Sequence, residues 1–140
     1  MDYETVPAAD LAHSLRGVGV NILCRDVGGT ARFLEAVFGL AVHRVSSDYA
    51  IVTHDGTVMQ LHADATYAGH PLHGLLPEGA ARGAGVQFYL FGCDPDAAAA
   101  RAEAAGGAVV EVPTDKPHGL REATILAPEG LAFSPAVPVA

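Results

Sequence analysis

The pattern of hydrophobic and polar residues along the chain predicts the same series of elements twice. In the first half, branched apolar residues at 18–24 indicate a strand. Residues 26–38 then form an amphipathic helix, because Asp26 can cap its start and apolar residues recur on one face. Gly39 is expected to end this helix. Three short strands are expected to follow, at 42–45, 49–53 and 57–62.

The second half repeats this order after a linker, at 63–84, in which glycine and proline recur without a clean period. A strand is expected at 86–91. Asp94-Pro95 is a strong helix start, because Asp caps a helix and Pro suits its first position. The alanine-rich run to residue 105 continues that helix, and two glycines end it. The last strands are expected at 108–112, 122–126 and 131–133.

Two offsets indicate that the halves are a repeat. The helix-ending Gly39 and Gly107 lie 68 residues apart, and the hairpin glycines Gly56 and Gly130 lie 74 apart. The difference falls in the strand-and-loop region, where insertions are tolerated. Two tandem βαβββ modules therefore fit better than one irregular chain. The sequence predicts a single α+β domain in which curved mixed sheets enclose a cavity and helices pack outside, with module one at about 16–64, a linker at about 65–84 and module two at about 85–138.

Composition and charge narrow the function classes. Half of the residues are hydrophobic and 17% are charged, which is typical of a globular protein. The formal net charge of −8 disfavours nucleic acid and anionic membranes as partners. Residues 1–15 are expected to be a loose lead-in and lack a signal-peptide pattern. Cys24 and Cys93 are expected to be reduced, buried thiols, so we expect a cytoplasmic protein.

The chain resembles the glyoxalase/bleomycin-resistance/extradiol dioxygenase (vicinal oxygen chelate) superfamily over about residues 16–138. The resemblance rests on the helix that ends Phe38-Gly39-Leu40, on the helix that begins Asp94-Pro95, and on the turn Pro128-Glu-Gly-Leu131 before the last strand. It implies a cavity for a small organic molecule and a homodimer. In metal-dependent members, the first and last strands of each module supply the metal ligands.

The resemblance assigns these four ligand positions to Gly19, Gln60, Gln87 and Ser134, which obey the two repeat offsets. Relatives usually have His, Glu or Gln there. Here none is an imidazole, a carboxylate or a thiolate, and Gly19 has no side chain. Divalent metals are bound mainly by such charged or imidazole groups. We therefore expect no metal and no other cofactor.

Side chains alternate between the faces of a strand, so residues two apart share a face. The cavity face is then aromatic and neutral-polar, which suits an uncharged or weakly charged organic ligand. The alternative is that the polar groups only satisfy each other or water. The expected ligand-binding residues on this face are Asn21, Gln60, His62, Gln87, Tyr89, Phe91 and Ser134. The opposite, helix-packing face is apolar and comprises Val18, Val20, Ile22, Met59, Leu61, Val86, Phe88 and Leu90.

Three histidines carry weaker expectations. His62 is the cavity-facing candidate for proton transfer near neutral pH, and a structural role is the alternative. His70 and His73 lie three residues apart, but Pro71 between them argues against a helix that would pair them. We interpret both as surface loop residues.

The segment 116–122 is the most distinctive loop. In relatives, similar loops precede the penultimate strand, so Arg121 and Glu122 are expected to line the cavity mouth and His118 to lie over the ligand. The alternative is a turn fixed by Pro117, with Arg121 paired to a surface carboxylate.

Three functions fit these features. The first is a metal-independent binding protein that resembles the bleomycin-resistance type and holds a small organic molecule unchanged. The second is a metal-dependent lyase, isomerase or dioxygenase with an atypical site. The third is a dimeric interaction module with a degenerate, filled cavity.

Overall fold

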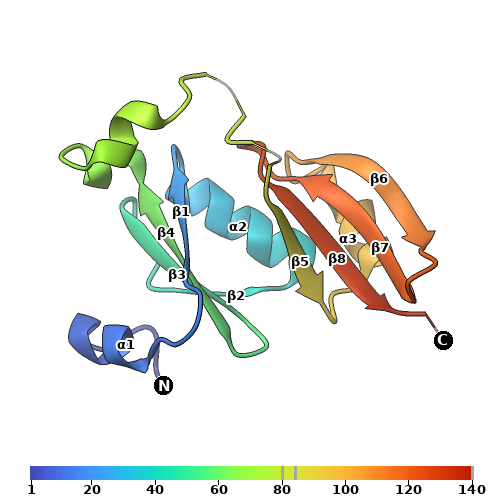
Figure 1. Cartoon of the computed structure of the whole chain (residues 1–140), viewed down its shortest axis with the longest axis horizontal. Coiled ribbons are helices and arrows are strands. Elements are labelled where there is room, and N and C mark those ends of the chain that lie inside the picture. Colours follow the sequence, from blue (N-terminus) through green and yellow to red (C-terminus); the bar gives the residue numbers. More distant parts are fainter. Residues whose placement is uncertain (80, 84, 140) are drawn as a thin grey trace. The chain divides into compact units, whose positions relative to one another are not determined.

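The computed structural model, which describes residues 1–79, 81–83 and 85–139, contains two four-stranded mixed sheets (Figure 1). The α+β class and the order of two βαβββ modules are thereby confirmed. The elements run α1 Ala8–Ser14, β1 Val20–Cys24, α2 Val27–Phe38, β2 Ala41–His43, β3 Tyr49–His54, β4 Thr57–Ala63, the 3-10 helices η1 Asp64–Tyr67 and η2 Pro71–Leu75, β5 Gln87–Phe91, α3 Pro95–Ala102, β6 Ala108–Asp115, β7 Leu120–Leu126 and β8 Ala132–Pro138.

The chain divides into two compact units. Unit 1 comprises Met1–Ala31 and Leu40–Leu75, and unit 2 comprises Arg32–Gly39 and Leu76–Ala140. The first part of helix α2 thus belongs to unit 1 and the remainder to unit 2. No helix among the described residues is long and apolar enough to span a membrane.

The sheet of unit 1 has the order β1-β4-β3-β2, with β1 parallel to β4 and the other neighbours antiparallel. The predicted hairpin is confirmed: His54 pairs with Thr57 across Asp55 and Gly56, which both have positive φ. A two-residue turn of this kind follows the right-handed twist of the strands it joins. This turn fixes the register between β3 and β4.

Helix α2 begins and ends where the sequence predicts. The backbone N–H of Gly29 donates to Asp26 Oδ1 over 2.9 Å, which is an N-cap. Gly39 has a φ of 71°, and its N–H donates to the carbonyl of Glu35. Only glycine adopts this conformation at low cost, so the helix ends there.

The prediction of a loose N-terminus is wrong, because residues 8–14 form α1. Leu11 of this helix and Val6 before it are buried in one cluster with Ile51 of β3. Arg44 holds the segment in place: its guanidinium donates to the carbonyl oxygens of Glu4 and Val6, the latter over 2.6 Å. Burial of apolar side chains, rather than helix propensity, stabilises so short a helix.

The sheet of unit 2 has the matching order β5-β8-β7-β6. Asp94 caps α3 as predicted, accepting from the N–H groups of Asp96 and Ala97. The core of unit 2 contains aromatic rings. The ring centroid of Phe133 lies 5.2 Å from that of Phe88 and 5.5 Å from that of Phe38. The rings therefore join α2 to the sheet within this unit.

Several boundaries differ from the predictions. Strand β8 continues to Pro138, although Pro135 cannot donate a backbone hydrogen bond to a neighbouring strand. The segment at Pro71 was expected to be a loop, yet residues 71–75 form η2, because proline is tolerated in the first turn of a helix. Helix α3 ends at Ala102, before the predicted residue 105.

Replacement of Gly107 should test the packing of α2 in unit 2. A Cβ atom there would lie 2.6 Å from Phe33 Cζ and 2.8 Å from the backbone oxygen of Leu126, and the backbone cannot yield easily. We expect Gly107→Ala to lower the free energy of unfolding by about 1–3 kcal/mol in urea titrations. Gly74→Ala is the control, because nothing lies within 4 Å of its Cβ position. Equal stability of both variants would contradict this packing.

Candidate functional site

The two faces of the unit 1 sheet differ in chemistry as predicted. Val20 pairs with Met59 and Ile22 with Leu61, which gives the helix-packing face its apolar side chains. Asn21 pairs with Gln60, so these polar side chains share the other face. The expectation that Val18 and Val86 pack against helices is wrong. Both precede their strands, and they are 93% and 58% exposed.

A hydrogen-bonded aromatic network lies on the polar face of unit 1. His62 Nδ1 lies 2.6 Å from Asn21 Oδ1, and Asn21 Nδ2 donates to the Tyr67 hydroxyl over 2.7 Å. The His62 ring also packs edge-on against Tyr49, with 4.9 Å between ring centroids. The structure thus brings Asn21 and His62 together, and it adds Tyr49 and Tyr67, which the sequence did not single out.

His62 is held as a neutral imidazole at neutral pH. Burial lowers its pKa below the ordinary value of 6.5. A neutral ring carries one N–H, and the contact with Asn21 Oδ1 assigns it to Nδ1. Nε2 then has a lone pair and can accept a hydrogen bond from a ligand.

Gln60 and His62 line a pocket of about 380 Å³ between α1 and the sheet. The Tyr49 hydroxyl donates to Gln60 Oε1 over 2.9 Å, which orients the amide so that its NH₂ group is available as a donor. Burial raises the pKa of Tyr49, so this phenol stays protonated. The pocket therefore combines an apolar wall with one amide donor and one imidazole acceptor. Its lining residues are Ala8, Leu11, Ala12, Leu15, Arg44, Tyr49, Gln60 and His62.

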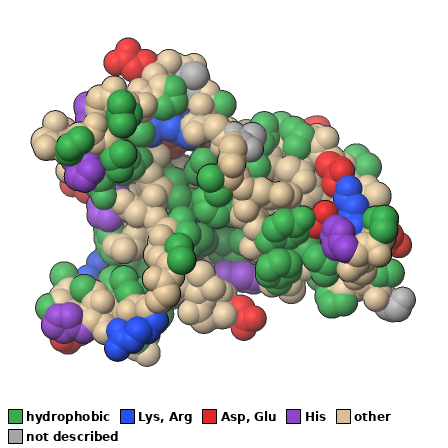
Figure 2. Space-filling view, in the orientation of Figure 1, with side chains coloured by type: hydrophobic (Ala, Val, Ile, Leu, Met, Phe, Trp, Pro, Cys, Tyr) green, Lys and Arg blue, Asp and Glu red, His purple; other side chains and the backbone are tan. Residues whose placement is uncertain are grey.

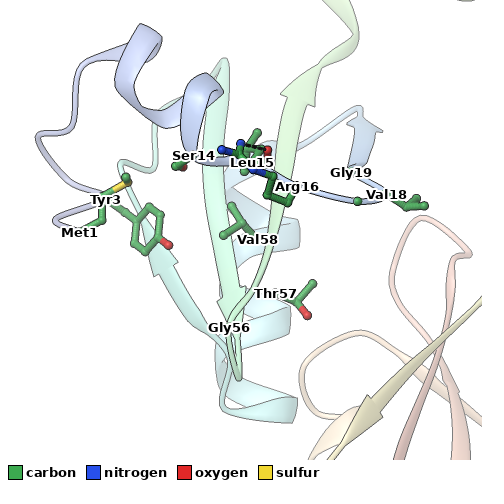
Figure 3. Close-up of a pocket in the computed structure, with 11 residues that line it drawn as sticks. Met1, Tyr3, Ser14, Leu15, Arg16, Val18, Gly19, Gly56, Thr57 and Val58 are labelled. Carbon is green, nitrogen blue, oxygen red and sulfur yellow. Dashed lines mark hydrogen bonds between the residues drawn. The ribbon is translucent and has the colours of Figure 1, made fainter.

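A second pocket of unit 1, of about 630 Å³, lies between the N-terminal segment and the β3–β4 hairpin (Figure 3). Gly19 lines it, and nothing lies within 4 Å of its Cβ position. Its labelled polar side chains are Tyr3, Ser14, Arg16 and Thr57. Arg16 donates to the carbonyls of His13 and Leu15, and Ser14 donates to that of Leu11. This pocket is larger than the one at Gln60, and its Arg16 and Ser14 side chains are already hydrogen-bonded to backbone carbonyls.

The polar face of unit 2 holds the other predicted residues. Gln87 Nε2 donates to Ser134 Oγ over 2.8 Å, and Ser134 Oγ lies 3.2 Å from Thr124 Oγ1. Ser134 is fully buried, so its hydroxyl is satisfied inside the protein. Tyr89 and Phe91 stack with 5.3 Å between centroids and an angle of 8°. Phe91 is 58% exposed.

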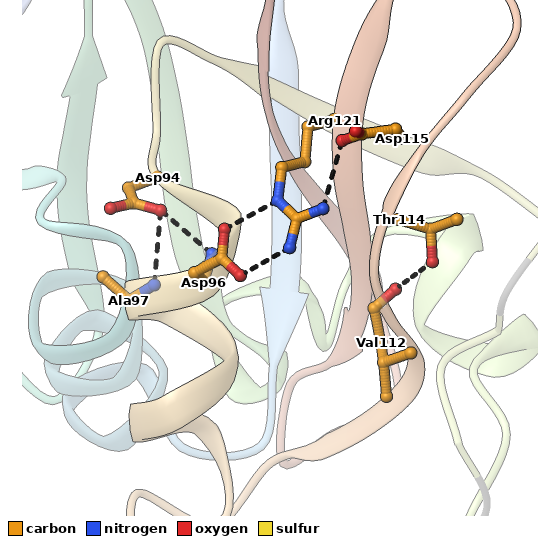
Figure 4. A network of polar contacts seen from close by, with 7 residues as sticks. All are labelled: Asp94, Asp96, Ala97, Val112, Thr114, Asp115 and Arg121. Carbon is orange, nitrogen blue, oxygen red and sulfur yellow. Dashed lines mark hydrogen bonds and ion pairs between the residues drawn. The ribbon is translucent and has the colours of Figure 1, made fainter. Parts of the chain in front are cut away.

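Arg121 does not join this face. Its guanidinium forms a paired contact with Asp96 at 2.8 Å and a further one with Asp115 at 3.1 Å (Figure 4). The arginine lowers the pKa of Asp96 through this contact. The structure thus shows the alternative that the sequence left open, a pairing of Arg121 with exposed carboxylates. His118 is 53% exposed, with Nε2 3.9 Å from Glu122 Oε2.

The four positions that hold metal in relatives do not fit a metal ion here. Gly19 offers no donor atom, the oxygen of Gln60 accepts from Tyr49, and the hydroxyl of Ser134 accepts from Gln87. Metal sites are usually built from imidazole, carboxylate or thiolate groups. Within residues 1–79, 81–83 and 85–139, no three His, Cys, Asp or Glu side chains are grouped so that they could hold an ion.

Two residues that line the pocket at Gln60, Tyr49 and Leu11, were not predicted from the sequence, for different reasons. The partner of His62 across the sheet is Tyr49, and the Asp55-Gly56 turn allows this pairing to be counted from the sequence. Leu11 carried no signal, since its role depends on α1 packing against β3.

Comparison with known proteins identifies a family to which the chain is similar. The family model described as Glyoxalase/Bleomycin resistance protein/Dioxygenase superfamily matches residues 16–134. No curated protein matches the chain significantly.

Three solved structures share the fold. A glyoxalase/bleomycin resistance protein/dioxygenase family enzyme from Burkholderia phytofirmans PsJN superposes with a TM-score of 0.71 at 20% identity, over 86% of this chain and 97% of that one. TioX from Micromonospora sp. ML1 gives 0.62 at 20% identity, over 89% and 99%. A gene product from Arabidopsis thaliana gives 0.64 at 22% identity, over 88% and 98%.

The pKa of His62 predicts a loss of stability in acid. Because the folded-state pKa is lowered, the unfolded chain binds a proton more readily as the pH falls through about 6.5. Stability is therefore full above that pH and decreases below it. We expect His62→Gln to reduce this decrease when urea unfolding is compared at about pH 7.5 and about pH 5.5.

His118→Gln serves as the control, since this histidine is 53% exposed. A pH dependence that stays unchanged in His62→Gln but disappears in His118→Gln would contradict the assignment.

Proposed function

We propose that this chain, which belongs to the glyoxalase/bleomycin resistance protein/dioxygenase superfamily, binds a small, neutral organic molecule in the pocket of unit 1 without metal. The observation that carries the proposal is that Gln60 and His62 lie together in a 380 Å³ pocket with apolar walls. Pockets of this size with a few placed polar groups are typical of small-molecule sites.

The pocket chemistry suggests the ligand class. The Gln60 amide supplies N–H donors, and the neutral His62 ring supplies an acceptor at Nε2. The Tyr49 ring and the side chain of Leu11 supply apolar contact. A flat molecule with both a carbonyl and an N–H or O–H group, such as an aromatic amide, satisfies all of these groups.

The alternative of a filled, degenerate cavity is disfavoured by the same pocket volume. The alternative of a metal-dependent lyase, isomerase or dioxygenase is disfavoured by the donor set, because Gly19 and the engaged Ser134 contribute no ligand. Assembly as a homodimer and a cytoplasmic location stay predictions from the resemblance and the composition.

Ligand-observed NMR with a panel of aromatic amides, benzamide among them, tests the pocket. We expect Gln60→Ala to weaken binding about tenfold, which corresponds to one hydrogen bond of about 1.4 kcal/mol. Arg121→Lys is the matched control, because Arg121 lies in unit 2 and pairs with Asp96. Equal binding by the wild type and Gln60→Ala would refute the site.

Elemental analysis of the purified protein tests metal independence. We expect less than stoichiometric zinc, nickel, manganese and iron. The four positions offer only the amides of Gln60 and Gln87 and the buried hydroxyl of Ser134. Stoichiometric metal that is lost in Gln60→Ala would favour the enzyme alternative instead.

A further inference from the structure

Unit 2 contains a buried carboxylate with one oxygen that accepts no hydrogen bond from the described residues. Glu122 lies on β7, and its side chain is only 7% exposed. Its Oε2 atom has no hydrogen-bond partner among the described residues. A buried carboxylate oxygen that accepts no hydrogen bond is costly, because it has lost its hydrogen bonds to water. Such an atom is a strong acceptor for a donor brought by a ligand.

Two aromatic rings accompany this carboxylate. Phe91 and Glu122 both pair with Ala136, from opposite sides of β8, so their side chains share one face of the sheet with that of Tyr89. The Glu122 carboxylate raises the pKa of Tyr89. Phe91 stacks on Tyr89 and is 58% exposed. The two rings thus lie on the same face of the sheet as the carboxylate, and aromatic faces attract organic cations.

The basic side chains nearby form no hydrogen bond to Glu122 Oε2, although His118 lies within ion-pair distance of it. Lys116 Nζ lies 2.7 Å from Glu111 Oε2, and this contact raises the pKa of Lys116. His118 Nε2 is 3.9 Å from Glu122 Oε2, which is beyond hydrogen-bond distance. Figure 2 shows acidic, basic and histidine side chains together over the ends of β6 and β7. No described basic group therefore donates a hydrogen bond to Oε2 of Glu122.

We propose that Glu122, Tyr89 and Phe91 form a binding site for an organic ammonium ion that carries an aromatic group. An N–H of the ammonium donates to Glu122 Oε2, and the aromatic part of the ligand packs against the exposed Phe91 ring. The formal net charge of −8 favours the approach of a cation. This site is distinct in residues and in ligand charge from the pocket at Gln60.

Phenethylamine and 2-phenylethanol are suitable probes, because they share the ring and the linker and differ in charge. In ligand-observed NMR, we expect the wild type to bind phenethylamine and to bind the alcohol at least about tenfold more weakly. Glu122→Gln should weaken phenethylamine binding by about tenfold or more, because the amide keeps the shape and loses the charge. Phe91→Ala should weaken it several-fold, and its exposure makes unfolding of this variant a small risk.

Asp115→Asn is the matched control. It removes the charge of an exposed carboxylate that pairs with Arg121. It should leave phenethylamine binding unchanged, and thermal unfolding of each variant should confirm that it is folded. Undiminished binding by both Glu122→Gln and Phe91→Ala, or equal binding of amine and alcohol, would overturn the proposal. Binding of a neutral ligand at Gln60 does not need the charge of Glu122. The proposal for the pocket at Gln60 and the proposal for Glu122 can therefore fail independently.

Discussion

The alternation of side chains along each strand is the constraint on which the rest of the structure depends. In β1 and β4, the paired residues Ile22 and Leu61 bury one face of the sheet, and Asn21 and Gln60 occupy the other. A shift of one residue would place the amides in the apolar layer, at a cost of roughly 1–3 kcal/mol for each unsatisfied group. The same burial that stabilises the sheet thus fixes which side chains are available for binding.

The polar side chains on the two sheets differ in how fully they are hydrogen-bonded. In unit 1, the groups satisfy one another: His62 contacts Asn21, and Tyr49 donates to Gln60. Each contact orients the remaining donor or acceptor of its side chain. In unit 2, Gln87 donates to Ser134, but one oxygen of Glu122 accepts no hydrogen bond from the described residues. The polar face of unit 1 is thus neutral, whereas that of unit 2 holds a buried carboxylate.

The N-terminal helix α1 converts a sheet face into a pocket. Without Leu11 and the other residues of this segment, Gln60 and His62 would lie on an open surface, where water competes for their hydrogen bonds. Arg44 makes the arrangement specific, because its guanidinium holds the backbone ahead of the helix. The pocket therefore depends on a contact with the N-terminal segment.

The sequence by itself determined the elements and their faces. Period-two alternation, the Asp26 and Asp94 caps, the Gly39 stop and the Asp55-Gly56 turn are local signals, and each acts through the backbone of a few neighbouring residues. They sufficed for the fold class, the module order and the shared face of the predicted binding residues.

Only the tertiary structure decided which of these side chains meet. The short helix α1 is stabilised by burial against Ile51, and no local pattern reports a contact made 40 residues away in the chain. Likewise, Arg121 and Glu122 are neighbours in sequence, but successive strand residues point to opposite faces. The arginine consequently pairs with Asp96, while the carboxylate is buried beside Tyr89.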